Sequence, residues 1–190
     1  MRPRDNPFAM DRLERVLAFR PEWSGTSWVA MLHDVLQGPR LRCVLGKHGA
    51  GKTTLLDGLA AQLAADGHPV QRWFFNDHLR VWNPLDRELT PQTIAIVDGD
   101  MHLSWMQRYR MQRFLASARV IVLCRHHAFG APPVLCRLSP NLDVLHACVR
   151  IAAPEYFGYL EPSLEHWFRL ERQNLRHVLR HCYDAVAALP

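Results

Sequence analysis

The chain has 190 residues, enough for one domain with a sizeable core, or for such a domain with a small helical appendage. Hydrophobic residues make up 48% and charged residues 22%, as in an ordinary soluble globular protein, and no apolar run reaches the roughly 18 residues of a membrane-spanning helix. The net charge of +5 permits binding to nucleic acid or another acidic partner, but the arginines are scattered, which favours solvated helix faces.

Residues 1–40 are predicted to form a helical arm. Within residues 11–20 the apolar side chains fall on roughly one helical face, and the proline that follows ends the segment. A second helix is expected over residues 26–37, with Thr26 or Ser27 as its N-cap. The sequence does not decide whether this arm braces a sheet or docks a partner.

Residues 41–138 alternate between short apolar runs and amphipathic stretches. We expect strands at residues 41–45, 70–75, 93–97, 119–124 and 134–138, and helices at 52–66 and 103–118. Residues 76–93 contain two prolines and are expected to form a long loop, or a short helix and a loop. This alternation predicts an α/β fold in three layers, with a mostly parallel five-stranded sheet and helices on both faces.

Residues 139–190 carry no strand signal. Helices are expected at residues 140–150, 162–172 and 174–189. A unit of this size is too small to be stable alone, so we expect a small C-terminal helical lid that leans on the sheet domain, close to whatever that domain binds.

A glycine-rich motif follows the first strand and opens the first helix of the core. It matches G-x-x-x-x-G-K-[ST] and reads Gly46, Lys47, His48, Gly49, Ala50, Gly51, Lys52 and Thr53. Small residues let successive backbone N–H groups form an anion nest, and the helix directs its positive dipole end at the same point. This P-loop predicts a binding site for the phosphates of ATP. The site extends to Thr54, and Lys52 is expected to contact the β- and γ-phosphates.

The third predicted strand ends in Asp98, the pattern called Walker B. A buried strand would deliver this carboxylate beside the P-loop, where it holds Mg²⁺ directly or through water. Thr53 and Asp98 are therefore the predicted metal ligands, and Lys52 and Asp98 the first two predicted catalytic residues.

Residues 40–185 resemble the P-loop ATPases that include the AAA+ and STAND families, in which an extra strand lies between the P-loop strand and the Walker B strand. Asp98-Gly99-Asp100 resembles the D-G step of STAND ATPases. Many AAA+ ATPases place a glutamate at the position of Gly99 to orient water, so the resemblance puts fast hydrolysis in doubt. Asp100 is the nearest substitute and His102 the second candidate; alternatively, both are solvent-facing loop residues.

Two further segments resemble the sensors of AAA+ proteins. Residues 119–127 resemble sensor 1, which implies that Arg125 or His126 senses the γ-phosphate; alternatively, Arg125 caps the strand at the surface. Residues 173–176 resemble the G-N-x-R step of sensor 2, with glutamine in place of glycine, which implies that Arg176 reaches the γ-phosphate from the lid. The alternative for Arg176 is a solvated helix arginine.

The chain also resembles small uncharacterised bacterial ATP-binding proteins. The likeness rests on Asn6-Pro7-Phe8, on residues 51–56 and on residues 174–184, and it implies no activity. Many AAA+ relatives complete their site with an arginine from a neighbouring subunit, so the resemblance also implies self-association through one of Arg108, Arg110 or Arg113.

Three functions are compatible with these motifs. The first is a slow ATPase or nucleotide-dependent switch, and no N-K-x-D motif favours GTP instead. The second is a small-molecule kinase in which Asp77 and Arg80 grip the substrate, although residues 126–133 lack the arginines of a kinase lid. The third is a nucleic-acid-associated module in which tryptophans stack on bases, although aromatics at such spacings are more often core. These tryptophans are Trp73, Trp82, Trp105 and Trp167.

The five cysteines form no CxxC pair and fall mostly inside apolar stretches, which predicts buried free thiols in a reducing cytoplasm. Arg2 and Arg4 are not followed by an apolar segment, which argues against a secretory signal. A metal site would draw on Cys124, His126, His127 and Cys136. Their spacing lacks the close pairs typical of zinc sites, which argues against it.

Overall fold

The computed structural model describes residues 5–83, 89–127 and 130–189. Residues 1–4 of the predicted arm, residues 84–88 of the predicted loop and residue 190 of the predicted lid therefore lie outside the described residues. In the described ranges, no helix is both long and apolar enough to cross a bilayer.

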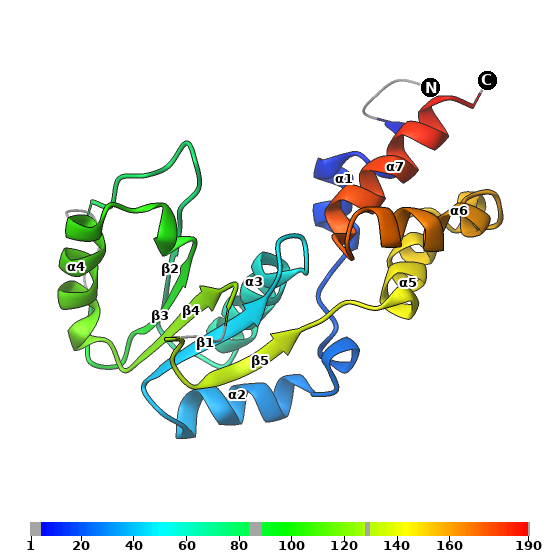
Figure 1. Ribbon diagram of the computed structural model, residues 1–190. Helices are drawn as coiled ribbons and strands as arrows, with labels where there is room; N and C mark the ends of the chain where they lie inside the picture. The colour runs from blue at the N-terminus through cyan, green and yellow to red at the C-terminus, as the bar shows by residue number, and fades with distance from the viewer. Residues whose placement is uncertain (1–4, 84–88, 128–129, 190) are drawn as a thin grey trace.

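A five-stranded, all-parallel sheet forms the centre of the protein (Figure 1). Its strands are β1 (Leu41–Gly46), β2 (Val70–Phe74), β3 (Ile94–Asp98), β4 (Val120–Arg125) and β5 (Val134–Leu138). They lie in the order β2-β3-β4-β1-β5, so β4 is inserted between the P-loop strand β1 and the Walker B strand β3. This insertion confirms the strand order that the resemblance implies. It also brings the carboxyl ends of β1, β3 and β4 to one edge of the sheet.

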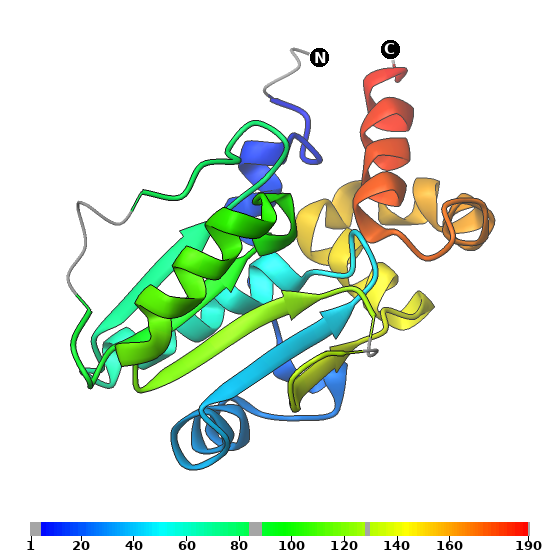
Figure 2. The same ribbon diagram turned by 60° about the vertical axis from the view of Figure 1, so that its left-hand side comes forward.

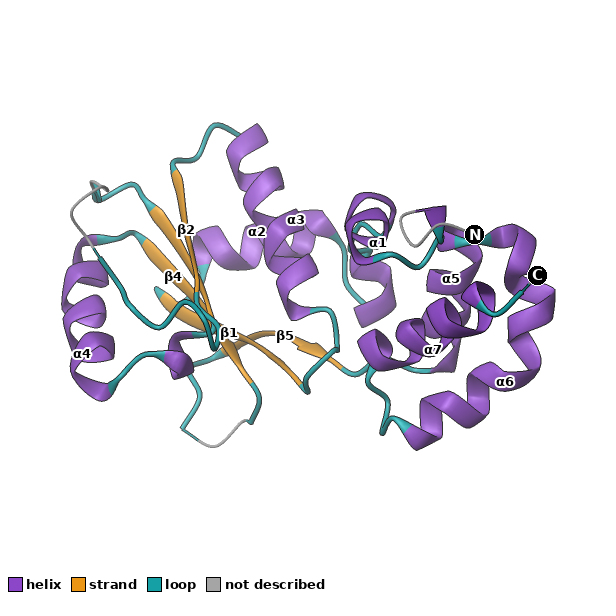
Figure 3. Ribbon diagram, turned by 90° about the horizontal axis from the view of Figure 1, so that it is seen from above, coloured by secondary structure: helices purple, strands orange, loops and turns teal. Residues whose placement is uncertain are grey.

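Helices cover both faces of the sheet, which confirms the predicted three layers (Figure 3). One face packs against α2 (Trp28–Gln37) and α3 (Lys52–Ala65), and the other against α4 (Trp105–Phe114) and the short helix η4 (Leu115–Ser117). Alternate residues of β3 point to opposite faces: Ile94 and Ile96 toward α3, and Ala95 and Val97 toward α4. All four are fully buried, because a parallel sheet is covered on both sides.

The C-terminal helices form a second cluster beside the sheet (Figures 1 and 2). They are α5 (Leu142–Ala152), the short η5 (Pro154–Tyr156), α6 (Phe157–Leu170) and α7 (Leu175–Ala187). Phe8 and the helix α1 (Met10–Val16) pack into this cluster, and the Asn6 side chain donates to the Tyr183 carbonyl at 2.9 Å. The short helix η2 (Pro21–Ser24) then leads to α2, which packs on the sheet. The division into residues 1–40, 41–138 and 139–190 stays a prediction.

The predicted start of α6 at residue 162 is wrong, because the helix begins at Phe157 and Pro162 lies inside it. Proline has no N–H to donate and usually marks a helix start, which is why the sequence misleads here. Leu160, Leu164 and Phe168 are buried at a spacing of four residues, so burial of this apolar face outweighs the lost hydrogen bond. All five cysteines are buried with free thiols, as predicted.

Candidate nucleotide site

The loop between β1 and α3 has the backbone that a phosphate nest requires. Gly49 and Gly51 adopt left-handed φ angles of 71° and 87°, and Ala50 between them is buried. Helix α3 begins at Lys52 and runs for 14 residues, so the positive end of its dipole faces the loop. Local sequence thus explains this part of the site fully.

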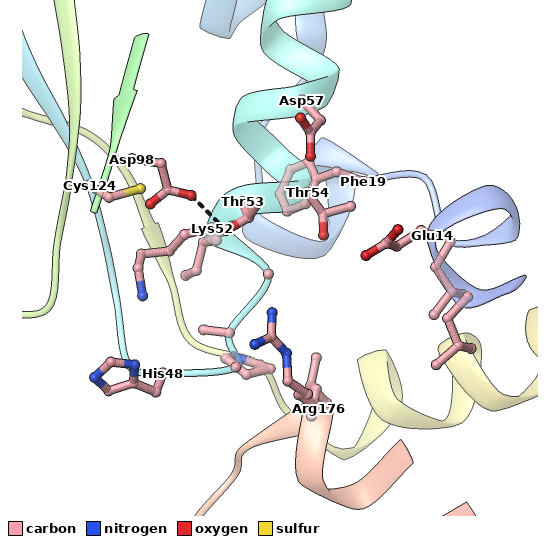
Figure 4. Close-up of a pocket in the computed structure, with 18 of the residues that line it drawn as sticks. Glu14, Phe19, His48, Lys52, Thr53, Thr54, Asp57, Asp98, Cys124 and Arg176 are labelled. Carbon is pink, nitrogen blue, oxygen red and sulfur yellow. Dashed lines mark hydrogen bonds between the residues drawn. The ribbon is translucent and has the colours of Figure 1, made fainter. Parts of the chain in front are cut away.

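A cleft of about 1130 Å³ opens beside this loop, between the sheet, the N-terminal arm and α7 (Figure 4). Residues 48–54 line it, together with Asp98 and Arg176. Gly46 and Lys47 belong to the predicted phosphate site but do not line the cleft. They contribute carbonyl oxygens that hold Lys52 instead.

The Lys52 ammonium group is held at the base of the cleft. Its Nζ donates to the carbonyl oxygens of Gly46 at 2.7 Å and Lys47 at 2.8 Å. Burial lowers the pKa of Lys52, the positive charge of Arg176 lowers it further, and Asp98 opposes the change. A desolvated ammonium group between weak acceptors is a favourable counter-charge for an anion.

Thr53 and Asp98 meet at the floor of the cleft. The Thr53 hydroxyl donates to Asp98 Oδ2 at 2.7 Å, and Asp98 is only 6% exposed (Figure 4). A hydroxyl and a carboxylate at one point are the oxygen donors that a hard cation such as Mg²⁺ prefers. Cys124 lies beside Asp98; burial and then the Asp98 charge raise the pKa of its thiol, which therefore stays protonated.

Two histidines stack at the mouth of the P-loop. The His48 and His126 rings lie 3.9 Å apart, and His126 Nδ1 lies 3.2 Å from the Gly46 carbonyl oxygen and 3.3 Å from Lys52 Nζ. Burial, then the Lys52 charge, lowers the pKa of His126 to about 4, so its imidazole is neutral at pH 7. His126 lines the cleft. The described residues contain no group of three potential ligands placed to hold a metal, so the alternative site around His126 and Cys136 is not formed there.

Asp100 and Arg125 pair with each other instead of lining the cleft. Arg125 donates two hydrogen bonds to the Asp100 carboxylate, at 2.5 and 3.1 Å, and the Asp100 side chain is 2% exposed. His102, the second candidate, does line the cleft, and its Nδ1 lies 3.3 Å from Asp77 Oδ1. Asp77 also pairs with Arg80, and neither of these two lines the cleft.

The backbone explains why Gly99 replaces the expected glutamate. Gly99 has a φ of 79°, and a Cβ atom there would lie 2.1 Å from the Phe75 carbonyl oxygen. A residue with a side chain would therefore have to displace the backbone at Phe75, directly after β2. The water-orienting position is closed to glutamate for a steric reason.

The C-terminal helical cluster touches the P-loop at the start of α7. Asn174 caps this helix by accepting from His177 N at 3.3 Å, and a Cβ atom added to Gly49 would lie 1.8 Å from the same Asn174 oxygen. Arg176 projects into the cleft toward the P-loop and forms no hydrogen bond or ion pair with a described residue (Figure 4). The structure thus brings together Lys52, Asp98 and Arg176 of the five predicted catalytic residues.

The N-terminal arm supplies cleft residues that no motif indicated. Glu14 and Phe19 project from the arm, opposite Thr54 and Asp57 of α3 (Figure 4). Asp57 is paired with Arg72, whereas Glu14 has no ion-pair partner among the described residues. Nothing in the sequence indicated that Glu14 and Phe19 line the cleft, because the arm reaches the cleft through tertiary packing, which local periodicity does not encode.

No protein-family model matches the sequence, and the search of curated proteins found no match. Among solved structures, the chain is similar to the ORC1 protein of Aeropyrum pernix in complex with DNA, with a TM-score of 0.55 and 15% identity. It is also similar to Drosophila ORC bound to DNA, with a TM-score of 0.50 and 12% identity. The matches cover 91% and 84% of this chain, but only 60% of each of those chains.

This chain has the strand order β2-β3-β4-β1-β5, a P-loop after β1 and a helical cluster after β5. At identities of 15% and 12% the two likenesses concern the fold. The chain has the fold of the AAA+ P-loop ATPases.

Proposed function

We propose that the chain binds ATP with Mg²⁺ in the cleft and acts as a slow ATPase or nucleotide-dependent switch. One observation carries the proposal: the P-loop, the Thr53–Asp98 pair and Arg176 of α7 converge on a single cleft. An anion nest, a cation site and a further positive charge are the parts that a Mg–triphosphate needs. The free thiols suit a cytoplasmic protein.

Each part of the nucleotide has a place in this proposal. The amides of residues 48–54 and Lys52 hold the phosphates, and Thr53 and Asp98 hold Mg²⁺. When bound, the cation neutralises phosphate charge. The nucleoside lies toward the arm, where Phe19 offers an aromatic face and Glu14 a hydrogen-bond acceptor.

The switch would operate through the lid, residues 139–190, over the core, residues 41–138, with residues 1–40 as the arm. Arg176 can pair with a phosphate only while α7 stands against the P-loop, so the ligand favours that position. The Asn174 side chain lies against Gly49 in this same position, which supports the proposal. Binding energy is thereby coupled to the place of the lid.

Slow turnover follows from the residues around Asp98. Gly99 cannot orient water, and the Asp100 carboxylate is held by Arg125 away from the cleft. We therefore assign Asp100 and Arg125 a structural role, in place of the catalytic one expected from the sequence. His126 then takes the place beside the γ-phosphate. The kinase alternative has no matching observation, because Asp77 and Arg80 pair with each other outside the cleft.

The test compares ATP affinity and turnover in wild type, Lys52→Ala and Arg176→Ala, with Arg169→Ala as the matched control. Arg169 is an exposed lid arginine that does not line the cleft. We expect Lys52→Ala to abolish measurable binding. Arg176→Ala should weaken binding about tenfold, the worth of one charge-assisted hydrogen bond. Unchanged affinity and turnover in Arg176→Ala would refute the lid switch, and absence of Mg–ATP binding by the wild type would refute the whole proposal.

A further inference from the structure

Helix α4 lies on the far side of the sheet from α2 and α3 (Figure 3). It carries an exposed aromatic and cationic surface. Trp105 is 78% exposed, Met106 54% and Tyr109 56%. Arg110 and Arg113 are exposed on the same side of the helix. These five residues, spaced at i, i+1, i+4, i+5 and i+8, form one continuous stripe, here called the α4 face.

The α4 face is separate from the side of the helix that holds α4 in place. Met111 and Leu115 are each 1% exposed and pack against the sheet. Arg108 is used at the helix start, where it donates to the carbonyl oxygens of Asp100 and Met101, each at 3.2 Å. Packing therefore anchors the helix without covering Trp105 or Tyr109.

The charge of this surface has one sign. Residues 105–114 contain three arginines and no acidic residue. Arg110 and Arg113 are exposed, and neither forms an ion pair or hydrogen bond with a described residue. The fitting partner is an anion with flat faces that can stack on indole and phenol rings.

We propose that the α4 face binds single-stranded nucleic acid. Bases stack on Trp105 and Tyr109, while Arg110 and Arg113 contact the phosphates. The two rings are four residues apart, about 6 Å along the helix axis, so each can receive a separate base of an extended strand. A duplex keeps its bases stacked on one another and offers them to no ring on a surface, so a single strand fits better.

This proposal goes beyond ATP binding and does not depend on it. Helix α4 packs on the sheet, at the end of the protein away from the lid helices α5–α7 (Figures 1 and 3). The Lys52→Ala variant should therefore bind a single strand as well as the wild type does. A failure of one proposal can thus be told from a failure of the other.

The experiment measures binding of the full chain to fluorescently labelled oligothymidylate, oligouridylate and a DNA duplex by anisotropy. We expect both single strands to bind more tightly than the duplex, with affinity falling steeply between about 50 and 200 mM salt. Trp105→Ala and Tyr109→Ala should each weaken binding about fivefold or more, the loss of one stacked base. Arg110→Gln should reduce the salt dependence by roughly one phosphate contact.

Tyr159→Ala in α6 is the matched control, because Tyr159 is also 56% exposed. It should leave binding unchanged, and thermal unfolding should show that all variants are folded. The proposal is overturned if no single strand binds, or if Tyr159→Ala weakens binding as much as Tyr109→Ala.

Discussion

Replacing Gly49 with alanine tests whether the lid stands against the P-loop. Two costs are expected in the nucleotide-free protein. The left-handed φ of 71° disfavours alanine by about 1 kcal/mol. The new Cβ atom would lie 1.8 Å from Asn174 Oδ1, so that side chain must rotate and give up its hydrogen bond to His177 N. Loss of such an N-cap costs about 1 kcal/mol, giving about 2 kcal/mol in total.

Gly51→Ala supplies the matched control. Gly51 also has a left-handed φ, 87°, but no atom lies within 4 Å of its added Cβ, so only the first cost of about 1 kcal/mol applies. Urea unfolding gives the free energy of unfolding of both variants. Gly49→Ala should lose about 1 kcal/mol more than Gly51→Ala, and this difference reports the contact between Asn174 and Gly49. In an Asn174→Gly background, where that contact and cap are already absent, the excess should vanish. Equal costs for the two alanine variants, or an excess that survives without Asn174, would refute the contact.

Three further predictions concern stability. Asp100→Asn should lower the free energy of unfolding by about 2 kcal/mol, because it leaves a partly buried Arg125 without its counter-charge. The same variant should change ATP turnover little. Unchanged stability together with lost turnover would restore the catalytic role of Asp100. The pKa of His126 is lowered from 6.5 to about 4, so the unfolded chain binds a proton at this position before the folded chain does as the pH falls. The free energy of unfolding, measured with urea, should therefore decrease as the pH falls from about 6.5 to about 4. The decrease should be less steep in His126→Asn. Gln173→Gly should raise the unfolding free energy by about 0.5–1 kcal/mol, because Gln173 has a φ of 69°; a lower melting temperature would contradict this.

The features that could be predicted from the sequence are those set by neighbouring residues. The P-loop lies in contiguous positions, and its glycines at 49 and 51 take the left-handed angles that the nest requires. The strands are continuous apolar runs, so their positions and the layered fold followed directly. Asp98 was found because it ends such a strand, and the parallel order of β1 and β3 then places it near Thr53.

The features that could not be predicted depend on contacts between distant segments. Arg125 was expected to sense a phosphate, but its nearest carboxylate is Asp100, which the turn after β3 brings to the end of β4. Asp100 and Arg125 can pair because β3 and β4 are neighbours in the sheet. No local sequence pattern distinguishes this ion pair from a catalytic arrangement. The contribution of Glu14 to the cleft was missed because α1 packs with α5 of the lid, more than 120 residues away in sequence.

The packing of the arm bears on how the lid can move. Phe8 and Leu13 belong to the same apolar cluster as α5, α6 and α7, and the Asn6 side chain is bonded to the Tyr183 carbonyl. If the lid swings from the P-loop, this part of the arm should move with it, because separating them would expose the apolar cluster to water. The bend then falls between α1, which belongs to the lid cluster, and α2, which packs on the sheet. Glu14 and Arg176 consequently travel together, so lid opening should remove contacts to both the nucleoside and the phosphates at once.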